Sequence, residues 1–515
     1  MKLFKSFTIV SGATFISRIT GYLRDTVFAY IFGANNITDA FYLAFTIPNF
    51  FRNLLAEGAL STAIIPIYSE ELNKKDFKEA NKNISNLISF LITLSLIITI
   101  LGIIFSPELI TIIAPGFEKK NISSLAVKLL RIMFPFLFFV SVSAMIMGVL
   151  NTLKHFLWPS LAQSFYNLTQ IIMIGCFSTY FGKTIEEKIF VAAYAVLIGE
   201  FLHILVQLPT LIKKKFNYIF YINIKSEVLK RGLKLLIPAI FGMSIIQLNL
   251  IVDSILGSYL EKGSISYLYY SNRLLQFPLA LFGISIGTVL LPLASELVAK
   301  KEYETLNTKL ISSLKIMLLF IIPSISGFWL LGKEIITVLF EHGKFTADDT
   351  YKTYCALAVY SAGLISYSAV KIFSSIYYAY QDTKTPVKFA VISLILNIII
   401  KIIIIFLWTK YFSYKEYRFI GLTFGTAFAS TFNLFLLAKN LKFKMGKFFR
   451  LKFLLSDFLK ILLINLIVFI VIFFLKTYIE QLNKYLELCI LLGFFASLYF
   501  LLLRFFKFDF KIFNI

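Results

Sequence analysis

Six ionisable side chains are set inside two otherwise apolar stretches near the amino terminus: Arg18, Arg24, Asp25, Asp39, Arg52 and Glu57. Such a group within a membrane span costs about 2.5–3.5 kcal/mol on insertion scales, so it usually faces a cavity or another ionisable group. The planar guanidinium of arginine binds phosphate through two parallel hydrogen bonds. The pattern therefore predicts a wet, positively charged chamber suited to a phosphate or pyrophosphate, and other acidic groups would also fit.

The spacing within the first stretch divides these residues between helix faces. On a regular helix Arg18 and Asp25 share a face, whereas Arg24 lies about 240° round from Arg18. Ser17 and Gly21 belong to the same stripe as Arg24. Both arginines can address one ligand only if the helix bends near Gly21 or the ligand is large.

A purely structural role is the alternative to a binding chamber. Salt bridges Arg18–Asp25 and Arg52–Glu57 would then only hold helices together. Arg24 has no evident partner nearby in the sequence, which favours the chamber.

Further polar residues lie close to a proline in two of the apolar stretches. Pro48 removes a helical hydrogen bond just before Asn49 and Arg52. A later stretch has a similar set, which comprises Tyr270, Asn272, Arg273, Gln276 and Pro278. We expect Arg273 to converge with the three amino-terminal arginines near the membrane midplane.

Two more ionisable residues inside apolar runs are expected to pair with each other. Asp253 and Lys401 would each be costly alone, and Lys401 follows Asn397 by one helical turn. Alternatively, Lys401 extends its ammonium to the membrane surface. Weaker candidates are Glu200, His203 and Lys371.

The composition requires a membrane protein. Of the 515 residues, 58% are hydrophobic and only 15% are charged, against about a quarter charged in soluble domains. Residues 84–107, 132–153 and 156–182 are uncharged runs, each longer than the ~20 residues that cross a bilayer core. The net charge of +23 is spread over short loops and forms no basic face for nucleic acid.

Apolar runs and charged breaks predict an all-α polytopic fold with about 14 transmembrane helices. The expected spans are 7–33, 37–68, 84–106, 125–151, 157–182, 188–212, 229–259, 264–296, 309–332, 351–379, 386–409, 418–438, 455–476 and 485–506. Lys and Arg are more frequent at the termini and after even-numbered spans, so both termini are expected in the cytoplasm. The amino terminus resembles a signal peptide but is interpreted as a retained first span. The three cysteines fall in predicted spans without metal-ligand spacing, as small buried hydrophobic residues would.

An internal repeat divides the chain. Residues 65–70 (IPIYSE) recur as residues 291–296 (LPLASE), 226 positions later, and Pro159 is matched by Pro386, 227 positions later. Six spans per unit place both units in the membrane with the same orientation, with a substrate site between them. The expected parts are two pseudo-symmetric six-helix lobes, 1–215 and 225–440, and two additional helices in 450–515.

Four motifs in this order resemble the MurJ (MviN) family of lipid II flippases, in the multidrug/oligosaccharidyl-lipid/polysaccharide exporter superfamily. The motifs are residues 17–25 (SRITGYLRD), 39–59 (DAFYLAFTIPNFFRNLLAEGA), 270–278 (YSNRLLQFP) and 381–387 (QDTKTPV). The resemblance implies two lobes plus two helices that form a lipid groove. It also implies that an undecaprenyl-pyrophosphate-linked peptidoglycan precursor moves from the inner to the outer leaflet by alternating access, in a bacterial cytoplasmic (inner) membrane.

The resemblance also implies roles for individual residues. Those expected to hold the head group or act beside it are Arg18, Arg24, Arg52, Arg273, Ser17, Asp25, Asp39, Asn49 and Glu57. A coupling or ion site is expected at Asp253, Asn397, Lys401 and Thr426. Lys401 falls where some members carry an acidic residue, so its ammonium would occupy the place of a cation. Gln276 stands where some relatives carry Glu.

Other functions fit the sequence less well. A cation-coupled drug antiporter of the same superfamily would prefer an acidic or aromatic cavity, and a membrane transferase would need clustered Asp, Glu or His. An exporter of another polyprenyl-linked saccharide and a scaffold for cell-wall enzymes remain alternatives. We expect no enzymatic activity and no cofactor. The expected partners are lipid II and membrane lipids, with other cell-wall synthesis proteins as additional candidates.

Overall fold

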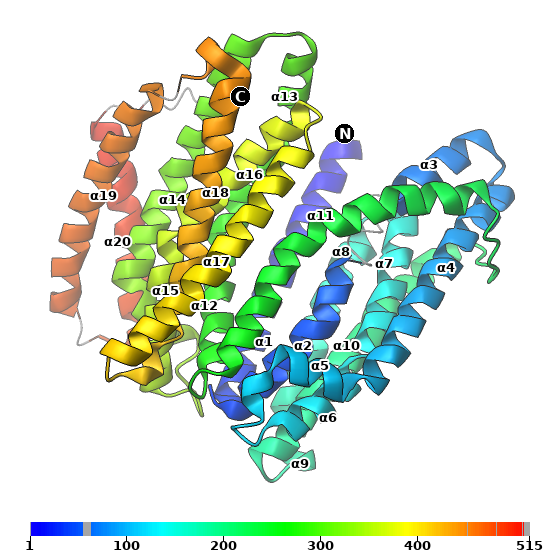
Figure 1. Ribbon diagram of the computed structural model, residues 1–515, viewed down its shortest axis with the longest axis horizontal. Helices are drawn as coiled ribbons and strands as arrows, with labels where there is room; N and C mark the ends of the chain where they lie inside the picture. Colours follow the sequence, from blue (N-terminus) through cyan, green and yellow to red (C-terminus); the bar gives the residue numbers. More distant parts are fainter. Residues whose placement is uncertain (1, 55–62, 451, 480–481, 507, 509–515) are drawn as a thin grey trace. The chain divides into compact units, whose positions relative to one another are not determined.

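The computed structural model describes residues 2–54, 63–450, 452–479, 482–506 and 508. These residues form helices and connecting turns, without a β-strand among them (Figure 1). By internal packing the chain divides into two compact units, Met1–Ile265 with Gly343–Phe345, and Ser266–His342 with Thr346–Ile515. The predicted division into six-helix lobes with two extra helices stays a prediction.

The helices of the first unit are α1 (Lys2–Phe32), α2 (Asn36–Arg52), α3 (Ile65–Lys74), α4 (Phe77–Ile104), α5 (Ser106–Ile113), α6 (Ser123–Met133), α7 (Phe136–Thr152), α8 (Leu157–Ile172), α9 (Ser178–Phe181), α10 (Ile185–Lys213) and α11 (Glu227–Ser258). Pro135 separates α6 from α7, because it cannot donate a helical hydrogen bond. A π-helical turn, η4 (Met173–Phe177), connects α8 with α9.

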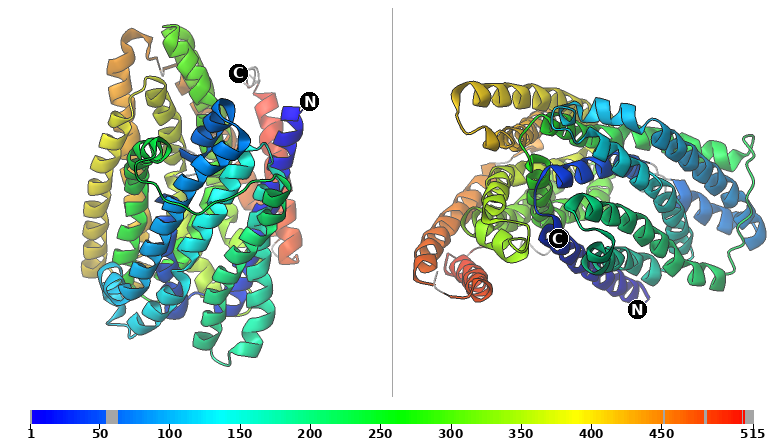
Figure 2. Two further views of the ribbon diagram at one scale, coloured as in Figure 1. Left: turned by 90° about the vertical axis from the view of Figure 1, so that its right-hand side faces the viewer. Right: turned by 90° about the horizontal axis from the view of Figure 1, so that it is seen from below.

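The helices of the second unit are α12 (Ser264–Pro278), which begins two residues before the boundary between the units, α13 (Ser285–Ala299), α14 (Tyr303–Leu339), α15 (Ala347–Ala362), α16 (Leu364–Ala379), α17 (Lys384–Tyr411), α18 (Ile420–Met445), α19 (Lys452–Ile479) and α20 (Lys484–Phe505). Within this unit α17 lies along α18, and α14, α19 and α20 pack against one another (Figure 2). Polar contacts join α14 to α19 at three levels, namely Lys315–Asp457, Ser326–Asn465 and Glu334–Lys476.

The predicted spans coincide with these helices or with runs of them, although the second span crosses residues 55–62, which lie outside the described residues. Among the described residues, nine helices are long and apolar enough to cross a membrane, or ten if the bent pair α15–α16 is one span. The remaining spans contain α1, α2, α8 and α11, which carry many of the predicted site residues. Helices α2 and α8, of 17 and 16 residues, are each shorter than a full span.

The internal repeat is visible in the backbone. Lys154 and Gln381, 227 positions apart, both have a positive φ near 57° and both lie five residues before the matched prolines. A π-helical turn begins at Asn53 in the first unit, and another, η5 (Leu279–Ile284), begins 226 positions later in the second. Two spans are therefore interrupted at equivalent positions.

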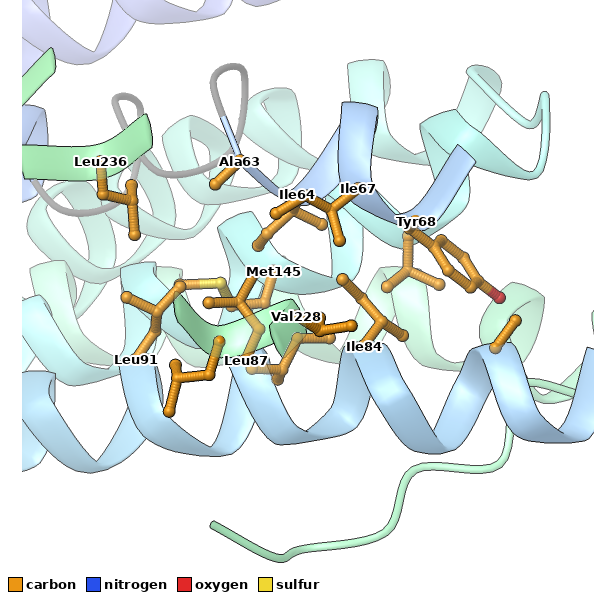
Figure 3. Close-up of a cluster of buried hydrophobic side chains, with 14 residues drawn as sticks. Ala63, Ile64, Ile67, Tyr68, Ile84, Leu87, Leu91, Met145, Val228 and Leu236 are labelled. Atoms are coloured by element: carbon orange, nitrogen blue, oxygen red, sulfur yellow. The ribbon is translucent and has the colours of Figure 1, made fainter. Parts of the chain in front are cut away.

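A buried cluster of apolar side chains from α3, α4, α7 and α11 forms part of the first unit's core (Figure 3). Gly232 allows α11 to approach α4 closely, because a Cβ there would lie 2.7 Å from Leu87 Cδ1. The loop before α11 is fastened along α4, where Asn86 exchanges two hydrogen bonds with the backbone of Asn223, of 2.8 and 3.1 Å. Polar residues of α4 thus hold the connection between the repeats.

The prediction that the cysteines are buried is wrong for two of the three. Cys176 and Cys489 are exposed, and Cys355 is half-buried. Apolar helices that cross a bilayer turn one side to lipid, so a small apolar residue is tolerated there as well as in the core.

Candidate functional site

Arg24 on α1 is held by two other side chains of the first unit. Its Nε and Nη2 donate to Asp25 Oδ1 at 3.0 and 2.7 Å, and its Nη1 donates to Asn167 Oδ1 on α8 at 3.3 Å. The side chains of Arg24 and Asp25 are 16% and 3% exposed. The sequence interpretation that Arg24 has no nearby partner is wrong, because its neighbour in the chain and a residue 143 positions away both reach it.

Asn167 fixes α8 against α1 at this point. Its Nδ2 donates to the Ser17 carbonyl oxygen at 3.1 Å and to Thr20 Oγ1 at 3.2 Å. The sequence analysis missed Asn167. A signal was available, since Ser164, Asn167 and Gln170 recur at helical spacing in an apolar span, and all three are buried.

Arg18, unlike Arg24, has a guanidinium group that is not held by another side chain among the described residues. It is half-buried, and no hydrogen bond or ion pair joins it to any residue that the structure describes. The alternative salt bridge Arg18–Asp25 does not form, since Asp25 pairs with Arg24 instead. Helix α1 also continues through Gly21 without a break.

Arg52 ends α2 and is oriented by two asparagines. Its Nε donates to Asn49 Oδ1 at 2.7 Å and its Nη2 to Asn53 Oδ1 at 2.8 Å. The helix changes to a π-helical turn at Asn53, four residues after Asn49. Glu57 lies outside the described residues, so the alternative pair Arg52–Glu57 stays a prediction.

Asp39 has a structural contact at the other end of α2. It is fully buried, and its Oδ2 accepts a hydrogen bond of 2.7 Å from the backbone N–H of Gly263. Asn35 and Thr38 form a capping box at the same helix end. A carboxylate in the first turn is also stabilised by the helix dipole. Asp39 therefore anchors α2 to the loop that precedes α12.

Tyr166 precedes Asn167 on α8, and both side chains are buried. Helix α8 meets Arg24 of α1 through the amide of Asn167. The residues Arg18, Arg24 and Arg52, with Asn49, Asn53, Tyr166 and Asn167, are together called the arginine site below, and their convergence on one ligand stays a prediction.

In the second unit, Arg273 lies half-buried on α12, one residue after Asn272, which accepts a 3.1 Å hydrogen bond from Gln276 Nε2. Pro278 and the π-helical turn η5 follow. Arg273 belongs to the other unit, so its convergence with the arginine site stays a prediction. Lys371 on α16 is exposed, and the described residues offer its ammonium no partner.

Two residues of the predicted coupling or ion site are buried where α17 packs on α18. Lys401 and Asn397 are 0% and 2% exposed. A Cβ on Gly425 would lie 2.5 Å from Lys401 Cγ and 3.1 Å from Asn397 Oδ1. Both side chains therefore pack directly against Gly425, which precedes Thr426. Full burial excludes the alternative in which Lys401 reaches the membrane surface. Asp253 lies on α11 in the first unit, and its pairing with Lys401 stays a prediction.

Comparison with known proteins adds independent evidence. The family model "Lipid II flippase MurJ" matches residues 28–493. A "Probable lipid II flippase MurJ" from Buchnera aphidicola subsp. Baizongia pistaciae is 37% identical over 476 residues, which cover 91% of this chain and 90% of the relative. The solved structure "Lipid II flippase MurJ, inward closed conformation" is 34% identical with a TM-score of 0.78, and the match covers 97% of this chain and 98% of the other.

An inward-facing multidrug resistance MATE transporter of the MOP superfamily has a TM-score of 0.66. At 14% identity over 84% of this chain and 96% of that one, it shows a shared fold alone. The family match, the curated relative and the solved flippase agree over nearly the whole chain, and the all-helical polytopic fold is confirmed. The chain belongs to the lipid II flippase MurJ family, a family of membrane transporters rather than enzymes.

Proposed function

We propose that this protein moves lipid II from the inner to the outer leaflet of a bacterial cytoplasmic membrane. The observation that carries the proposal is the arginine site, in which Asn167 of α8 holds Arg24 and two asparagines orient Arg52. A lipid-linked pyrophosphate is the ligand that best matches clustered guanidinium groups within a membrane. Family membership narrows this chemistry to the peptidoglycan precursor.

The three arginines would contribute differently to binding. Arg18 is uncommitted and can offer all of its donors to a phosphate, whereas Arg24 and Arg52 are held by Asp25, Asn167 and the asparagines of α2. Such fixing reduces the rotamer entropy that an arginine loses when it binds a ligand. Arg273 would complete the grip from the second unit.

Transport would follow alternating access, in which the two units rock about the bound head group and expose it first to one leaflet and then to the other. The helices α19 and α20 would guide the polyprenyl tail. Both termini would lie in the cytoplasm, and other cell-wall synthesis proteins would be optional partners.

The residues Asp253, Asn397, Lys401 and Thr426 would form a site without a bound metal ion. In this proposal the buried Lys401 ammonium takes the place of a cation and pairs with Asp253. Replacing sodium by choline at constant ionic strength would then leave transport unchanged.

Arginine substitutions test the proposal. In vesicles reconstituted with lipid II, Arg18→Ala, Arg24→Ala and Arg52→Ala should each slow the appearance of lipid II in the opposite leaflet at least tenfold, because a hydrogen bond to a charged group contributes about 1.5–3 kcal/mol. Arg131→Ala is the matched control, since Arg131 is exposed on α6. Wild-type transport by all three variants would refute the arginine site.

A further inference from the structure

The linker between α10 and α11, residues 214–226, runs beside α4 without helical structure (Figure 1). Three of its backbone N–H groups, at every second residue, donate to polar side chains of α4. The pairs are Ile219 with Ser85 Oγ at 3.4 Å, Tyr221 with Ser89 Oγ at 3.3 Å and Asn223 with Asn86 Oδ1 at 2.8 Å. Alternate residues point the same way in an extended chain, so the linker follows α4 as a strand follows the edge of a sheet.

One face of this extended segment is apolar and exposed. Because side chains alternate between the two faces, Tyr218, Phe220 and Ile222 lie on the same one, and Ile224 follows at the turn. These four side chains are 39%, 64%, 39% and 73% exposed. A contiguous exposed apolar surface of this kind marks a contact with a protein, a ligand or a membrane.

The position of the linker along α4 sets its depth. Ser85, Asn86 and Ser89 lie in the first turns of the uncharged run 84–107, shortly after Lys82. The linker therefore lies where this span enters the bilayer and not at the bilayer centre. Backbone outside a helix is excluded from the hydrocarbon core, but the head-group region supplies water for its remaining polar groups.

The charges that flank the apolar face distinguish a lipid surface from a protein partner. Lys213, Lys214 and Lys215 precede the face and Lys225 follows it, all four are exposed, and residues 213–225 contain no Asp or Glu. Lysine is depleted in the contact surfaces between proteins. At a membrane, by contrast, lysine stems lie along apolar groups while the ammonium groups attract lipid phosphates.

We infer that the linker is a membrane anchor whose apolar face enters the boundary between head groups and acyl chains in the cytoplasmic leaflet. Its ligand is phospholipid, with acyl chains against Phe220 and its neighbours and phosphates beside the lysines. The polar side chains of α4 hold the linker at this depth. The connection between α10 and α11 thereby stays at one level of the membrane. This role is additional to transport and needs no lipid II.

The test places a fluorescent nitrobenzoxadiazole label on the apolar face. Phe220→Cys is labelled in the full-length protein, with Cys176, Cys355 and Cys489 replaced by alanine, in vesicles of phosphatidylethanolamine and phosphatidylglycerol. Some of the lipids carry a nitroxide quencher, either high or low on the acyl chain. The label should lose most of its fluorescence to the shallow nitroxide and much less to the deep one, as expected for a depth of about 5–10 Å into the boundary.

Two further label positions serve as controls. Ile224→Cys should respond as Phe220→Cys does, because both side chains are exposed on the linker. Asn73→Cys, at an exposed position in the charged stretch before α4, should instead be quenched by iodide present on both sides of the membrane. Quenching of the Phe220→Cys label by iodide rather than by nitroxide would place the linker in water and overturn the inference. Quenching by neither would place it against protein, with the same consequence.

Unmodified protein provides a second measurement that does not depend on the labelled variants. A phospholipid with a photoreactive diazirine on its acyl chain should cross-link to residues 216–224 in vesicles that contain no lipid II. The exposed apolar side chains Ile97 and Ile100 of α4 are the positive control. Cross-links to α4 without any to the linker would overturn the inference.

Discussion

At the scale of single residues, the three amino-terminal arginines show how an apolar span can carry charge. Arg24 donates hydrogen bonds to Asp25 and Asn167, and Arg52 donates to two asparagines. Arg18 makes no hydrogen bond or ion pair with any residue that the structure describes. An asparagine side chain orients a guanidinium without carrying a charge of its own. Asp25, by contrast, forms an ion pair with Arg24.

Asn167→Ala tests whether the orientation of Arg24 matters. Removal of the Asn167 amide takes away the hydrogen bond between Arg24 and α8, and also the hydrogen bond from α8 to the Ser17 carbonyl oxygen. We expect a loss of about 1 kcal/mol in lipid II affinity, roughly fivefold, from one hydrogen bond. Gln163→Ala, exposed on the same helix, should bind normally. Equal affinities for both variants would show that Asn167 does not position Arg24.

At the scale of elements, the close packing of α17 on α18 depends on the absence of a side chain. Lys401 occupies the space that a Cβ at Gly425 would require. A fully buried lysine stem packs as a hydrophobic group, and only its ammonium needs a polar partner. This packing fixes Lys401 and Asn397 beside Thr426.

Gly425→Ala should therefore destabilise the protein although alanine favours helix. The new Cβ would collide with Lys401 Cγ at 2.5 Å, and overpacking of this kind costs about 1–3 kcal/mol. Thermal unfolding in detergent measures the effect. Gly493→Ala in α20 meets nothing within 4 Å and should be neutral or slightly stabilising. Lys401→Ala removes the clashing Cγ, so a fully additive double variant would contradict the stated cause.

The turn between α16 and α17 is stabilised by the Asp382 carboxylate. Burial raises its pKa, but hydrogen bonds from the Thr385 N–H, the Lys444 ammonium and the Thr385 hydroxyl outweigh burial, and the net pKa is lowered. The contribution of this carboxylate is thus fully present above its ordinary pKa of 3.8 and is lost as pH falls through the lowered value.

Asp382→Ala should cost about 1 kcal/mol of stability at neutral pH, as the loss of a helix cap does. The difference from the wild type should shrink on acidification, because the wild-type carboxylate then becomes protonated. Thermal unfolding as a function of pH measures this, with exposed Lys384→Ala as the control. A difference that stays constant down to strongly acidic pH would contradict the electrostatic cause.

At the scale of the whole molecule, the membrane potential acts on the charges of the protein and of any ionic ligand. The net charge of +23 reflects lysines and arginines spread over loops and termini. An inside-negative potential favours outward movement of an anionic head group by about 2.3 kcal/mol per charge per 100 mV. The membrane potential can therefore drive outward movement of an anionic head group without a chemical reaction at the protein.

Imposing an inside-negative potassium diffusion potential on reconstituted vesicles should accelerate outward movement of lipid II, and dissipating it should slow that movement. Dye-quenching of labelled lipid II at the outer surface measures the rate, with protein-free vesicles as the control. Rates that are indifferent to the potential would show that no net charge moves with the head group.

The sequence by itself determined the class of the molecule and singled out the charged residues of its amino-terminal spans. Apolar runs longer than a bilayer is thick admit only helices, because a backbone in lipid must satisfy its own hydrogen bonds. Arg18, Arg24 and Arg52 were found because ionisable residues are conspicuous in such runs. The repeat was visible from matched prolines, which impose local backbone geometry wherever they occur.

Only the tertiary structure decided which partners these residues have. Asp25 binds its neighbour Arg24 rather than Arg18 on its own helix face, and Asn167 joins them from 143 positions away. Helical periodicity specifies which side a residue faces, but not which helix packs on that side or how far a flexible guanidinium extends. For the same reason the sequence showed Glu200 and His203 only as a spacing, whereas the structure buries both and joins them by a hydrogen bond of 2.9 Å.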